Sequence, residues 1–339
     1  MRIAVDAREL QGRPTGVGRF LSELLCAWKG LPDAQPHEFL LLAPDDGGGT
    51  AWEQFTLPRL IRESGADMLF APAYTAPLRA GVPVVLVIHD VSFCAHPEWF
   101  SWREGARRRT ITTLAARRAR RVITVSEFSK REVVAHLGVD ASKVDVVYHG
   151  LTRVASGSTT DVASGFSRKS GTTVLYVGSL FNRRHVPELI DGFARFNRTG
   201  QFDLQIVGEN RTSPHIPFTA LPPRVHLRSY VPDEELMRLY GQAAAFVFLS
   251  DYEGFGLTPL EAMGAGVPSI VLDTPVSREV YGDAAFYVPR PDPDLIAAAL
   301  AEVTGDTATR QRLLAAAPSA LARYSWDASA RRVLEILTR

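Results

Sequence analysis

The chain has 339 residues, 46% of them hydrophobic, and its 38 Lys and Arg residues nearly balance its 37 Asp and Glu residues. This length exceeds the size at which a single hydrophobic core usually keeps growing, so we expect two domains. The formal net charge of +1 gives no global attraction to nucleic acid or to strongly acidic partners, and we expect no nucleic-acid partner.

The cellular compartment is predicted from the cysteines and the apolar runs. Cys26 and Cys94 are the two cysteines of the chain, which is neither a disulfide framework nor a metal-ligand cluster and favours a reducing compartment. The N-terminus becomes charged too early for a signal peptide, and the longest apolar runs, 82–88 and 243–249, are too short to cross a bilayer. We expect a cytoplasmic protein, either freely soluble or peripheral to the inner face of the membrane.

Short apolar, β-branched runs recur along the chain and alternate with segments of helical periodicity or turn residues. In the first half they cover residues 3–5, 39–42, 68–70, 82–88, 122–125 and 144–148. In the second half they cover residues 174–177, 204–207, 225–227, 246–249, 269–272 and 285–288, with helical intervals such as 234–243 and 293–303. This rhythm predicts an α/β protein with two successive parallel sheets wrapped by helices. Ligands bind at strand tips in such sheets, so two facing sheets would form one deep interdomain cleft.

The domain boundary is predicted from composition. Residues 151–171 are small and polar and have no apolar face to bury, which is typical of a linker or a flexible loop. The segment from Ser325 to Leu337 has a Ser cap followed by apolar residues at helical spacing, which predicts a closing helix packed on a domain surface.

Glu253 and Glu261 bracket a glycine-rich stretch, the most informative one in the chain. Gly254 and Gly256 allow a tight turn and a close approach to a ligand, and a helix is predicted to begin at Leu257. Free amides and the dipole at a helix start favour phosphate, while flanking carboxylates can accept hydrogen bonds from sugar hydroxyls. The pattern predicts a nucleotide-sugar site. For either glutamate alone, a charge complementing a helix start or a solvated loop charge is the simpler interpretation.

Other candidate residues follow strands of the predicted first sheet. Gly16, Gly18 and Arg19 follow the first strand and open a helix, but the pattern is short, and the rest of a dinucleotide fingerprint is missing, so NAD binding is not expected. His89 and Asp90 end the strand 84–88. His89 could orient a substrate hydroxyl or stabilise charge near the reacting carbon, or it could be satisfied by local backbone, and Asp90 could cap the next segment.

Cations are predicted at a strand tip of the second half. Arg183 and Arg184, beside His185, follow the strand 174–177, where a guanidinium could grip the diphosphate of a leaving nucleotide. A solvated surface pair is the alternative. Asp292 and Asp294 are surrounded by prolines without further ligands nearby, and we expect no metal requirement.

The segment Trp99 to Arg121 combines aromatic residues with clustered arginines. It contains Trp99, Phe100, Trp102, Arg103, Arg107, Arg108, Arg109, Arg117, Arg118, Arg120 and Arg121. On a helical stretch this composition could contact an anionic membrane or an acidic acceptor, while an ordinary exposed helix face is the alternative.

The segment Tyr252 to Pro268, containing EGFGLTPLEAMGAGVP, resembles the signature of the retaining glycosyltransferases of family four, which have the GT-B architecture. The resemblance also takes in residues 16–20, 88–90, 125–129, 177–180 with 183–185, and 231–236, so it spans nearly the whole chain. It implies two Rossmann-like domains facing an interdomain cleft. The acceptor-binding domain would cover 1–152 plus 322–339 with a returning C-terminal helix, the linker 153–171, and the nucleotide-sugar-binding domain 172–321.

The resemblance also implies roles for single residues. Glu253 would contact the donor sugar, Glu261 the ribose hydroxyls, and His89 would lie near the anomeric centre. Relatives frequently have Lys where this chain has Arg184, and many carry an arginine at the position of Ser179. The predicted catalytic residues are therefore His89, Glu253 and Arg184, the donor-binding residues are Gly16, Gly18, Ser179, Arg183, Arg184, Glu253, Gly254, Phe255, Gly256, Leu257 and Glu261, and the acceptor-side residues are Arg19, Asp90, Ser126 and Glu127.

A reaction without metal or cofactor is expected. Arg184 and the loop after Glu253 could stabilise the departing nucleoside diphosphate, and no carboxylate is clearly poised as a nucleophile, which favours same-face attack by the acceptor hydroxyl. Retention of configuration is implied by the resemblance alone. Domain closure about a hinge near Ser156 would exclude water.

The donor is expected to be a nucleotide-diphosphate sugar, GDP-mannose first by resemblance to the mannosyltransferases and UDP-sugars next. The acceptor would be a saccharide or a lipid-linked hydroxyl. Two other functions stay open at this point: a nucleotide-sugar epimerase of the same architecture, which needs an acid/base pair acting on the sugar ring, and a catalytically silent sugar-binding module.

Overall fold

A computed structural model describes residues 1–12, 16–45, 48–151 and 171–339. The chain divides into two compact units: the first comprises Met1–Thr152 with Tyr324–Arg339, and the second comprises Arg153–Arg323. Except for Gly171, the predicted linker 153–171, including the hinge near Ser156, lies outside the described residues.

The first unit is a six-stranded sheet with the strand order β2-β1-β3-β4-β5-β6, in which every neighbouring pair is parallel. Its strands are β1 (Arg2–Asp6), β2 (Glu38–Leu42), β3 (Met68–Ala71), β4 (Val84–Val87), β5 (Arg121–Thr124) and β6 (Val144–Val146). Its helices are α1 (Gly16–Gly30), α2 (Leu57–Ser64), α3 (Ser92–Ala95), α4 (Trp102–Arg118), α5 (Glu127–Leu137) and α13 (Trp326–Thr338).

The second unit repeats this architecture, with the strand order β12-β11-β10-β7-β8-β9 and parallel neighbours throughout. Its strands are β7 (Thr173–Val177), β8 (Asp203–Val207), β9 (Val225–Arg228), β10 (Ala243–Phe248), β11 (Ser269–Leu272) and β12 (Ala285–Val288). Its helices are α7 (Val186–Phe196), α8 (Asp233–Gln242), α9 (Leu257–Gly264), α10 (Pro275–Tyr281), α11 (Pro293–Gly305) and α12 (Thr307–Leu321). The prediction of an α/β protein with two parallel sheets is confirmed.

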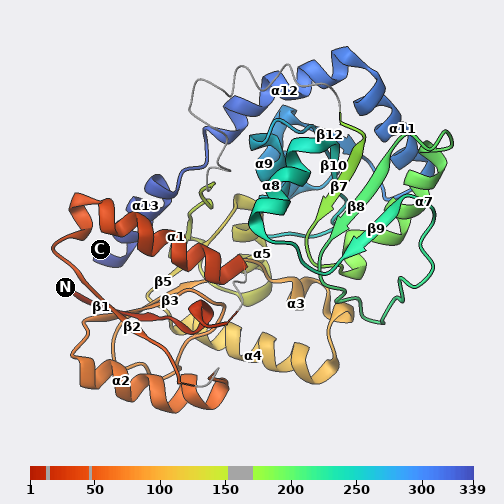
Figure 1. Cartoon of the computed structure of the whole chain (residues 1–339). Helices are drawn as coiled ribbons and strands as arrows, with labels where there is room; N and C mark the ends of the chain where they lie inside the picture. Colours follow the sequence, from red (N-terminus) through yellow and green to blue (C-terminus); the bar gives the residue numbers. More distant parts are fainter. Residues whose placement is uncertain (13–15, 46–47, 152–170) are drawn as a thin grey trace. The chain divides into compact units, whose positions relative to one another are not determined.

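The central strands are apolar and buried, as expected where helices cover both faces of a sheet, whereas the edge strands β2 and β9 are partly exposed. All four residues of β3 and all six of β10 are buried, without the alternation that a half-exposed sheet would show. In the first unit, α1 and α13 lie side by side on one face (Figure 1), and the indole Nε1 of Trp28 donates a hydrogen bond to the carbonyl of Ala330 at 2.9 Å. The last helix of the chain is therefore part of the core of the first unit.

Close packing in the second unit depends on a glycine. Helices α7 and α11 lie side by side (Figure 1), and a Cβ added to Gly192 of α7 would come within 2.7 Å of the Ile296 side chain of α11. Because real Cβ atoms almost never approach so closely, a residue without a side chain is needed at this contact.

Two predicted helical segments differ in extent from the structure. The interval 234–243 ends at Gln242 because Ala243 already pairs in β10. The segment Trp99 to Arg121 is not one helix: α4 covers only Trp102–Arg118, and Arg121 begins β5, where its guanidinium pairs with the buried Asp145.

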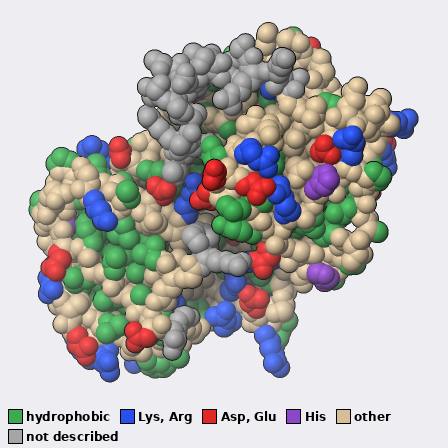
Figure 2. All heavy atoms as spheres, in the orientation of Figure 1, with side chains coloured by type: hydrophobic (Ala, Val, Ile, Leu, Met, Phe, Trp, Pro, Cys, Tyr) green, Lys and Arg blue, Asp and Glu red, His purple; other side chains and the backbone are tan. Residues whose placement is uncertain are grey.

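The surface of the described residues carries mixed charge. On the face drawn in Figure 2, Lys and Arg side chains are interspersed with Asp and Glu side chains. None of the helices in the described part of the chain is long and apolar enough to span a bilayer, and none of its His, Cys, Asp and Glu side chains form a group of three that could hold a metal ion.

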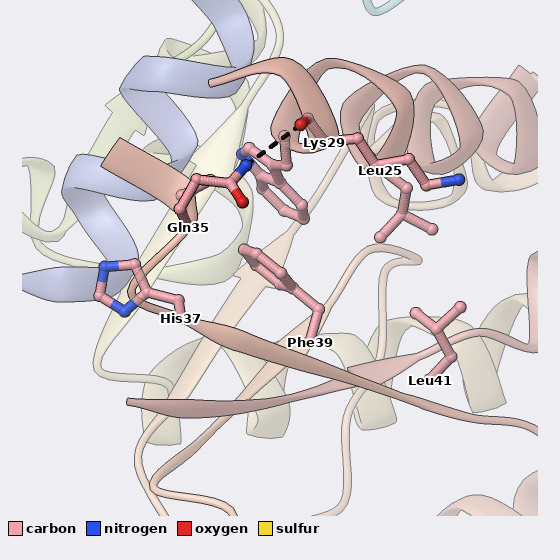
Figure 3. A pocket seen from close by; sticks show the side chains of 8 residues that line it. Leu25, Lys29, Gln35, His37, Phe39 and Leu41 are labelled. Carbon is pink, nitrogen blue, oxygen red and sulfur yellow. Dashed lines mark hydrogen bonds between the residues drawn. The ribbon is translucent and has the colours of Figure 1, made fainter. Parts of the chain in front are cut away.

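A pocket of 290 Å³ opens on the first unit between α1 and the edge strand β2 (Figure 3). Its wall is largely apolar, with Trp28 and Phe39 stacked at 4.5 Å. It is lined by Leu25, Trp28, Lys29, Ala34, Gln35, His37, Phe39 and Leu41. None of the predicted site residues lines it, so it is separate from the candidate site.

Candidate functional site

Two adjacent strands bring Arg184 and Glu253 together. Arg184 follows β7 and Glu253 follows β10, and these strands are neighbours in the second sheet. Both Nε and Nη2 of Arg184 lie 2.8 Å from Oε1 of Glu253, with side chains 13% and 18% exposed. Ser250 Oγ donates to the same oxygen at 2.8 Å, and Arg184 Nη1 donates to the carbonyl of Ser179 at 2.9 Å. The two charges are thus held in a fixed geometry at the carboxyl edge of the sheet.

Two aromatic rings contact the Arg184 guanidinium. Its carbon lies 4.9 Å from the Phe248 ring centroid and 5.3 Å from that of Phe181, which are cation–π distances. Burial alone would lower the pKa of Arg184, but the neighbouring Glu253 carboxylate outweighs it and the pKa is raised. Burial likewise raises the pKa of Tyr176 to about 12, and its hydroxyl donates to the Ser179 carbonyl at 3.1 Å. The site therefore contains a permanently charged guanidinium that packs on the aromatic rings of Phe181 and Phe248, close to the neutral Tyr176.

Arg183 and His185 flank Arg184 in the same turn. The guanidinium of Arg183 lies 4.4 Å over the Phe181 ring, and its carbonyl accepts from the amide of Asp251 at 2.9 Å. His185 Nε2 lies 2.7 Å from the Asp251 carboxylate. The turn after β7 is thereby tied to the loop after β10.

The glycine loop leads into α9 as the sequence predicts. Gly256 is the residue before the helix and has φ 89° and ψ 73°, a left-handed conformation that favours glycine. Tyr281 Oη donates to the Gly256 carbonyl at 2.9 Å, and a Cβ on Gly256 would collide with that oxygen. Gly254 and Phe255 are buried, and Glu261 is buried within α9. Leu257 is the first residue of the helix.

The buried hydroxyl of Thr258, in the first turn of α9, has no hydrogen-bond partner within the described part of the chain. Because a buried hydroxyl is normally paired, this one is a candidate for a ligand contact.

In the first unit His89 follows β4 and is buried, and its Nε2 donates to the carbonyl of Pro72 at 2.9 Å. Burial lowers the pKa of His89, although the Pro72 hydrogen bond and the charges of Asp90 and Glu9 oppose the change. Since a carbonyl only accepts, Nε2 carries the proton, and Nδ1 of the neutral ring is the acceptor.

The Asp90 carboxylate is engaged within its own unit. Tyr74 Oη donates to Oδ2 at 3.0 Å and the Ser92 amide donates to Oδ1 at 2.8 Å. Asp90 thus connects the start of α3 to Tyr74 in the loop after β3, although the residue before that helix is Val91 and no side chain caps it.

The remaining predicted residues of the first unit lie at two helix starts. Ser126 is fully buried and caps α5, with its Oγ accepting from the Ser129 amide at 2.9 Å. Ser129 Oγ donates to the His89 carbonyl at 3.3 Å, which brings the 126–129 segment next to His89. Glu127 begins α5 and is exposed. Gly16, Gly18 and Arg19 all lie in the first turn of α1.

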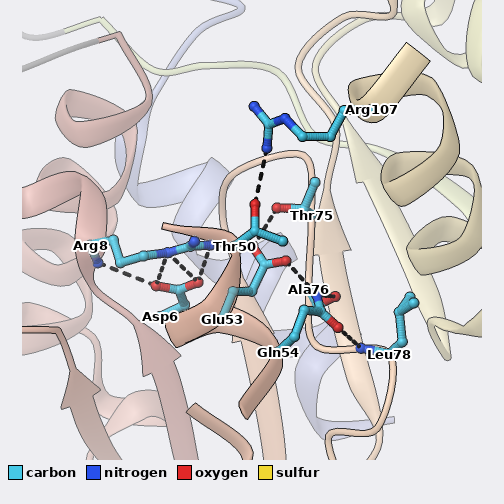
Figure 4. Close-up of polar contacts among 9 residues, drawn as sticks. All are labelled: Asp6, Arg8, Thr50, Glu53, Gln54, Thr75, Ala76, Leu78 and Arg107. Carbon is cyan, nitrogen blue, oxygen red and sulfur yellow. Dashed lines mark hydrogen bonds and ion pairs between the residues drawn. The ribbon is translucent and has the colours of Figure 1, made fainter. Parts of the chain in front are cut away.

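A buried charge cluster at the end of β1 was not predicted (Figure 4). Asp6 and Glu53 are each 2% exposed and share Arg8, whose Nη2 lies 2.7 Å from a carboxylate oxygen of each. Thr75 Oγ1 and Gln54 Nε2 donate to the two oxygens of Glu53 at 2.5 and 2.7 Å. Burial raises the pKa of Asp6 despite Arg8. Every carboxylate oxygen of Asp6 and Glu53 accepts a hydrogen bond, so the cluster stabilises the loops of this unit that it joins.

Sequence reasoning also missed Ser250, Tyr281 and His149. Ser250 is a polar residue just after the apolar strand β10, a signal that could have identified it. Tyr281 ends α10, and no sequence signal links it to Gly256.

Most of the chain matches two protein families. Residues 23–152 match the family described as Glycosyltransferase Family 4, and residues 158–320 match the family described as Glycosyl transferases group 1. Among curated proteins, the chain is 25% identical to O-antigen chain mannosyltransferase B of Escherichia coli over 72% of this chain and 67% of that protein. It is 26% identical to O-antigen chain mannosyltransferase RfbU of Salmonella typhimurium over 68% of this chain and 62% of that protein. The chain thus spans about two thirds of the length of these relatives.

Solved structures share the fold over the full length. The structure of Anabaena Alr3699/HepE in complex with UDP and glucose aligns with a TM-score of 0.73 at 19% identity, covering 99% of both chains. The structure of WaaG, a glycosyltransferase involved in lipopolysaccharide biosynthesis, aligns with a TM-score of 0.73 at 15% identity, covering 100% of both chains. Together with the two parallel sheets, these likenesses confirm the predicted GT-B fold with two Rossmann-like domains.

Proposed function

Because the two halves of this chain match two glycosyltransferase families, we propose that the protein transfers a hexosyl group from a nucleotide-diphosphate sugar to a hydroxyl of a saccharide or lipid-linked acceptor. The mannosyltransferase relatives favour GDP-mannose as the donor, and the UDP in the HepE structure makes a UDP-sugar the next candidate. We assign donor binding mainly to the second unit and acceptor binding to the first.

The observation that carries this proposal is the Arg184–Glu253 pair. A guanidinium has five N–H donors, and at least one remains for a phosphate oxygen after the contacts with Glu253, Ser179 and Tyr176. All donors to Glu253 from the described residues go to Oε1, so Oε2 can accept from a sugar hydroxyl. One side chain would thus hold the leaving diphosphate while the other holds the sugar.

The leaving group would be stabilised by the protein alone. Negative charge that develops on the diphosphate would face Arg184 and Arg183 and the amides of Phe255, Gly256 and Leu257 at the start of α9. Glu261 would bind the ribose, and the Thr258 hydroxyl adds a polar group in the same turn. We propose that no metal or cofactor is needed.

The transfer step would use His89. Its neutral Nδ1 can accept a hydrogen bond from a sugar hydroxyl near the anomeric carbon, while Nε2 stays on Pro72. We propose same-face attack by the acceptor hydroxyl and therefore retention of configuration. Arg19, Asp90, Ser126 and Glu127 would define the acceptor side, Asp90 and Ser126 by fixing the loops.

We propose that α4 makes a peripheral contact with anionic lipid. Trp102 is 79% exposed, and Arg103, Arg107 and Arg108 are exposed on the same helix. The positive charge of the patch is smaller than the sequence indicates, because Arg121 pairs with Asp145 and Arg108 pairs with Glu104 of the same helix.

Two measurements test the proposed function. Thermal unfolding with GDP, UDP, ADP or TDP should show one nucleotide that raises the melting temperature in a concentration-dependent manner, because only the native state binds it. Product analysis should then show transfer when donor and acceptor are present together, and at most slow hydrolysis with the donor alone. An altered sugar with the donor alone would indicate an epimerase, and no response to any nucleotide would reject the proposal.

A further inference from the structure

The imidazole rings of His89 and His149 stack against each other in the first unit. Their centroids are 5.5 Å apart with an angle of 5° between the planes, and the residues are 8% and 6% exposed. His89 follows β4 and His149 follows β6, which lie on either side of β5. The stack therefore forms across the carboxyl edge of the sheet from residues that are distant in sequence.

Two helices hold this stack in place. Phe20 of α1 meets both imidazoles edge-on, with centroid distances of 5.1 Å to each ring. Trp326 of α13 lies 5.9 Å from the His149 ring at an angle of 70°. A Cβ on Gly150 would run into the backbone nitrogen and the indole of Trp326, so a glycine is needed for this close approach. The His149 ring thus has little room to move.

The surroundings of both rings favour their neutral forms. Burial lowers the pKa of His89 and lowers that of His149 well below its ordinary value, with the charge of His89 as the second cause for His149. Asp90 and Glu9 are the charged groups that favour protonation of His89. Because Nε2 of His89 donates to Pro72, the orientation of its ring decides where the Nδ1 acceptor points.

We propose that His149 is a positioning residue for His89: its ring, held by Phe20 and Trp326, excludes water from one face of the His89 imidazole and fixes the ring plane in which Nδ1 can accept a substrate hydroxyl. The positioning role of His149 rests on the proposed function in one respect, because it assumes that His89 contacts the substrate. The role follows from shape and burial, so an aromatic ring without nitrogen should replace His149.

The test compares His149→Ala with His149→Phe in the full-length protein. Titration of histidines labelled with ¹³C and ¹⁵N is followed by NMR, and the signal of His89 is assigned by its loss in His89→Gln. In His149→Ala water reaches the ring, so the midpoint of His89 should rise toward the ordinary value of about 6.5, and in His149→Phe it should stay at the wild-type value. His226→Ala, which removes an exposed histidine of the second unit, is the control and should leave the signal unchanged.

The activity measurement follows the same variants. In His149→Ala, kcat/KM should fall about 10- to 100-fold because the acceptor atom is misplaced, and the acid limb of its pH profile should move to higher pH with the His89 midpoint. His149→Phe should keep both the rate and the profile. A loss of stability alone would lower the folded fraction without moving the acid limb.

The outcomes separate this inference from the proposed function. An unchanged His89 midpoint in His149→Ala, with transfer activity intact, overturns the inference and leaves the proposed function in place. If the titration midpoint of His89 shifts in His149→Ala while transfer activity is unchanged, His149 does shield His89 from water, but His89 has no role in transfer. If His149→Ala does not fold, His149→Asn, which retains a polar side chain of smaller size, provides the same comparison.

Discussion

At the residue scale, the ligand-binding role that we propose for the Arg184–Glu253 pair is compatible with the small net stability that such a pair contributes. Removing two charges from water is costly, and their mutual attraction in the interior often only offsets that cost. Here both side chains are largely buried, and Ser250 and Ser179 supply the additional hydrogen bonds that keep the pair in one geometry. A chain that needed only stability could place apolar residues at these positions.

Glu253→Gln should lower kcat/KM by about 100-fold or more, because the amide keeps the size of the side chain but loses the charge that fixes Arg184 and one of the two acceptor oxygens. Steady-state kinetics with the donor identified by thermal shift would measure it. Glu209→Gln is the matched control, since Glu209 forms an exposed pair with Arg211 in the same unit and should stay within twofold of wild type. Equal losses in both variants would contradict the role of Glu253.

His185 makes stability depend on pH. Burial would lower its pKa, but hydrogen bonds to Asp251 and Glu188 raise it to about 9. The folded protein therefore holds this proton above the unfolded pKa of about 6.5, so the stabilisation is complete below that pH and is lost as the pH rises through about 9.

His185→Asn tests this dependence. His185 has φ 49° and ψ 41°, a left-handed conformation that asparagine tolerates well, so the variant removes the titrating group without backbone strain. Urea unfolding at pH 6 and pH 9.5 measures the free energy of unfolding of both proteins. The difference between wild type and the variant should be about 1 kcal/mol smaller at pH 9.5 than at pH 6, a figure that allows for solvent screening. A constant difference would show that the ion pair does not form. His226→Asn, at an exposed histidine, is the control.

At the scale of elements, helix starts provide most of the candidate ligand positions. Ser126 caps α5 and Ser325 caps α13 through ordinary side-chain hydrogen bonds. Helix α9 differs, because its first residue follows Gly256 in a left-handed conformation and no side chain caps it. The Gly256 carbonyl is instead held by Tyr281 at the end of α10. A residue of α10 thus stabilises the conformation of the loop that leads into α9.

Tyr281→Phe should raise the KM for the donor by about three- to tenfold with a small effect on kcat, the magnitude expected for the loss of one neutral hydrogen bond. Tyr287→Phe is the matched control, because Tyr287 Oη donates to the carbonyl of Gly282 at 2.6 Å in the same unit. Both variants should lower the melting temperature similarly, and only Tyr281→Phe should change the KM. A KM change of the same size in both would show that the effect is one of stability.

At the scale of the whole molecule, each unit buries its own hydrophobic clusters, and these support the two groups of candidate residues separately. The core of the first unit includes α13, whose Val333, Ile336 and Leu337 are buried against that sheet. The second unit has its own core around β7 and β10. The residues assigned to the nucleotide lie mainly in the second unit, whereas His89 and the acceptor-side residues lie in the first.

Nucleotide binding should therefore protect the second unit selectively. Hydrogen exchange measured by mass spectrometry with the nucleoside diphosphate alone should slow in segments 178–185 and 250–261, because bound ligand suppresses their local opening. Amides of strands β1 to β3 should exchange at unchanged rates. Protection of the first unit without the second would reject the assignment of the nucleotide site.

The sequence alone determined the twelve strands within the described residues, the helix that follows the glycine loop and the capped final helix, because periodicity and capping are local properties of a chain. The predicted strands also placed His89, Asp90, Arg183 and Arg184 just after strands, where the structure has them. Only the tertiary structure decided which of them meet: Arg184 with Glu253, Tyr281 with Gly256, and His89 with His149. These contacts join loops after different strands or helices, and the order of strands in a sheet, which decides them, is not encoded in local periodicity.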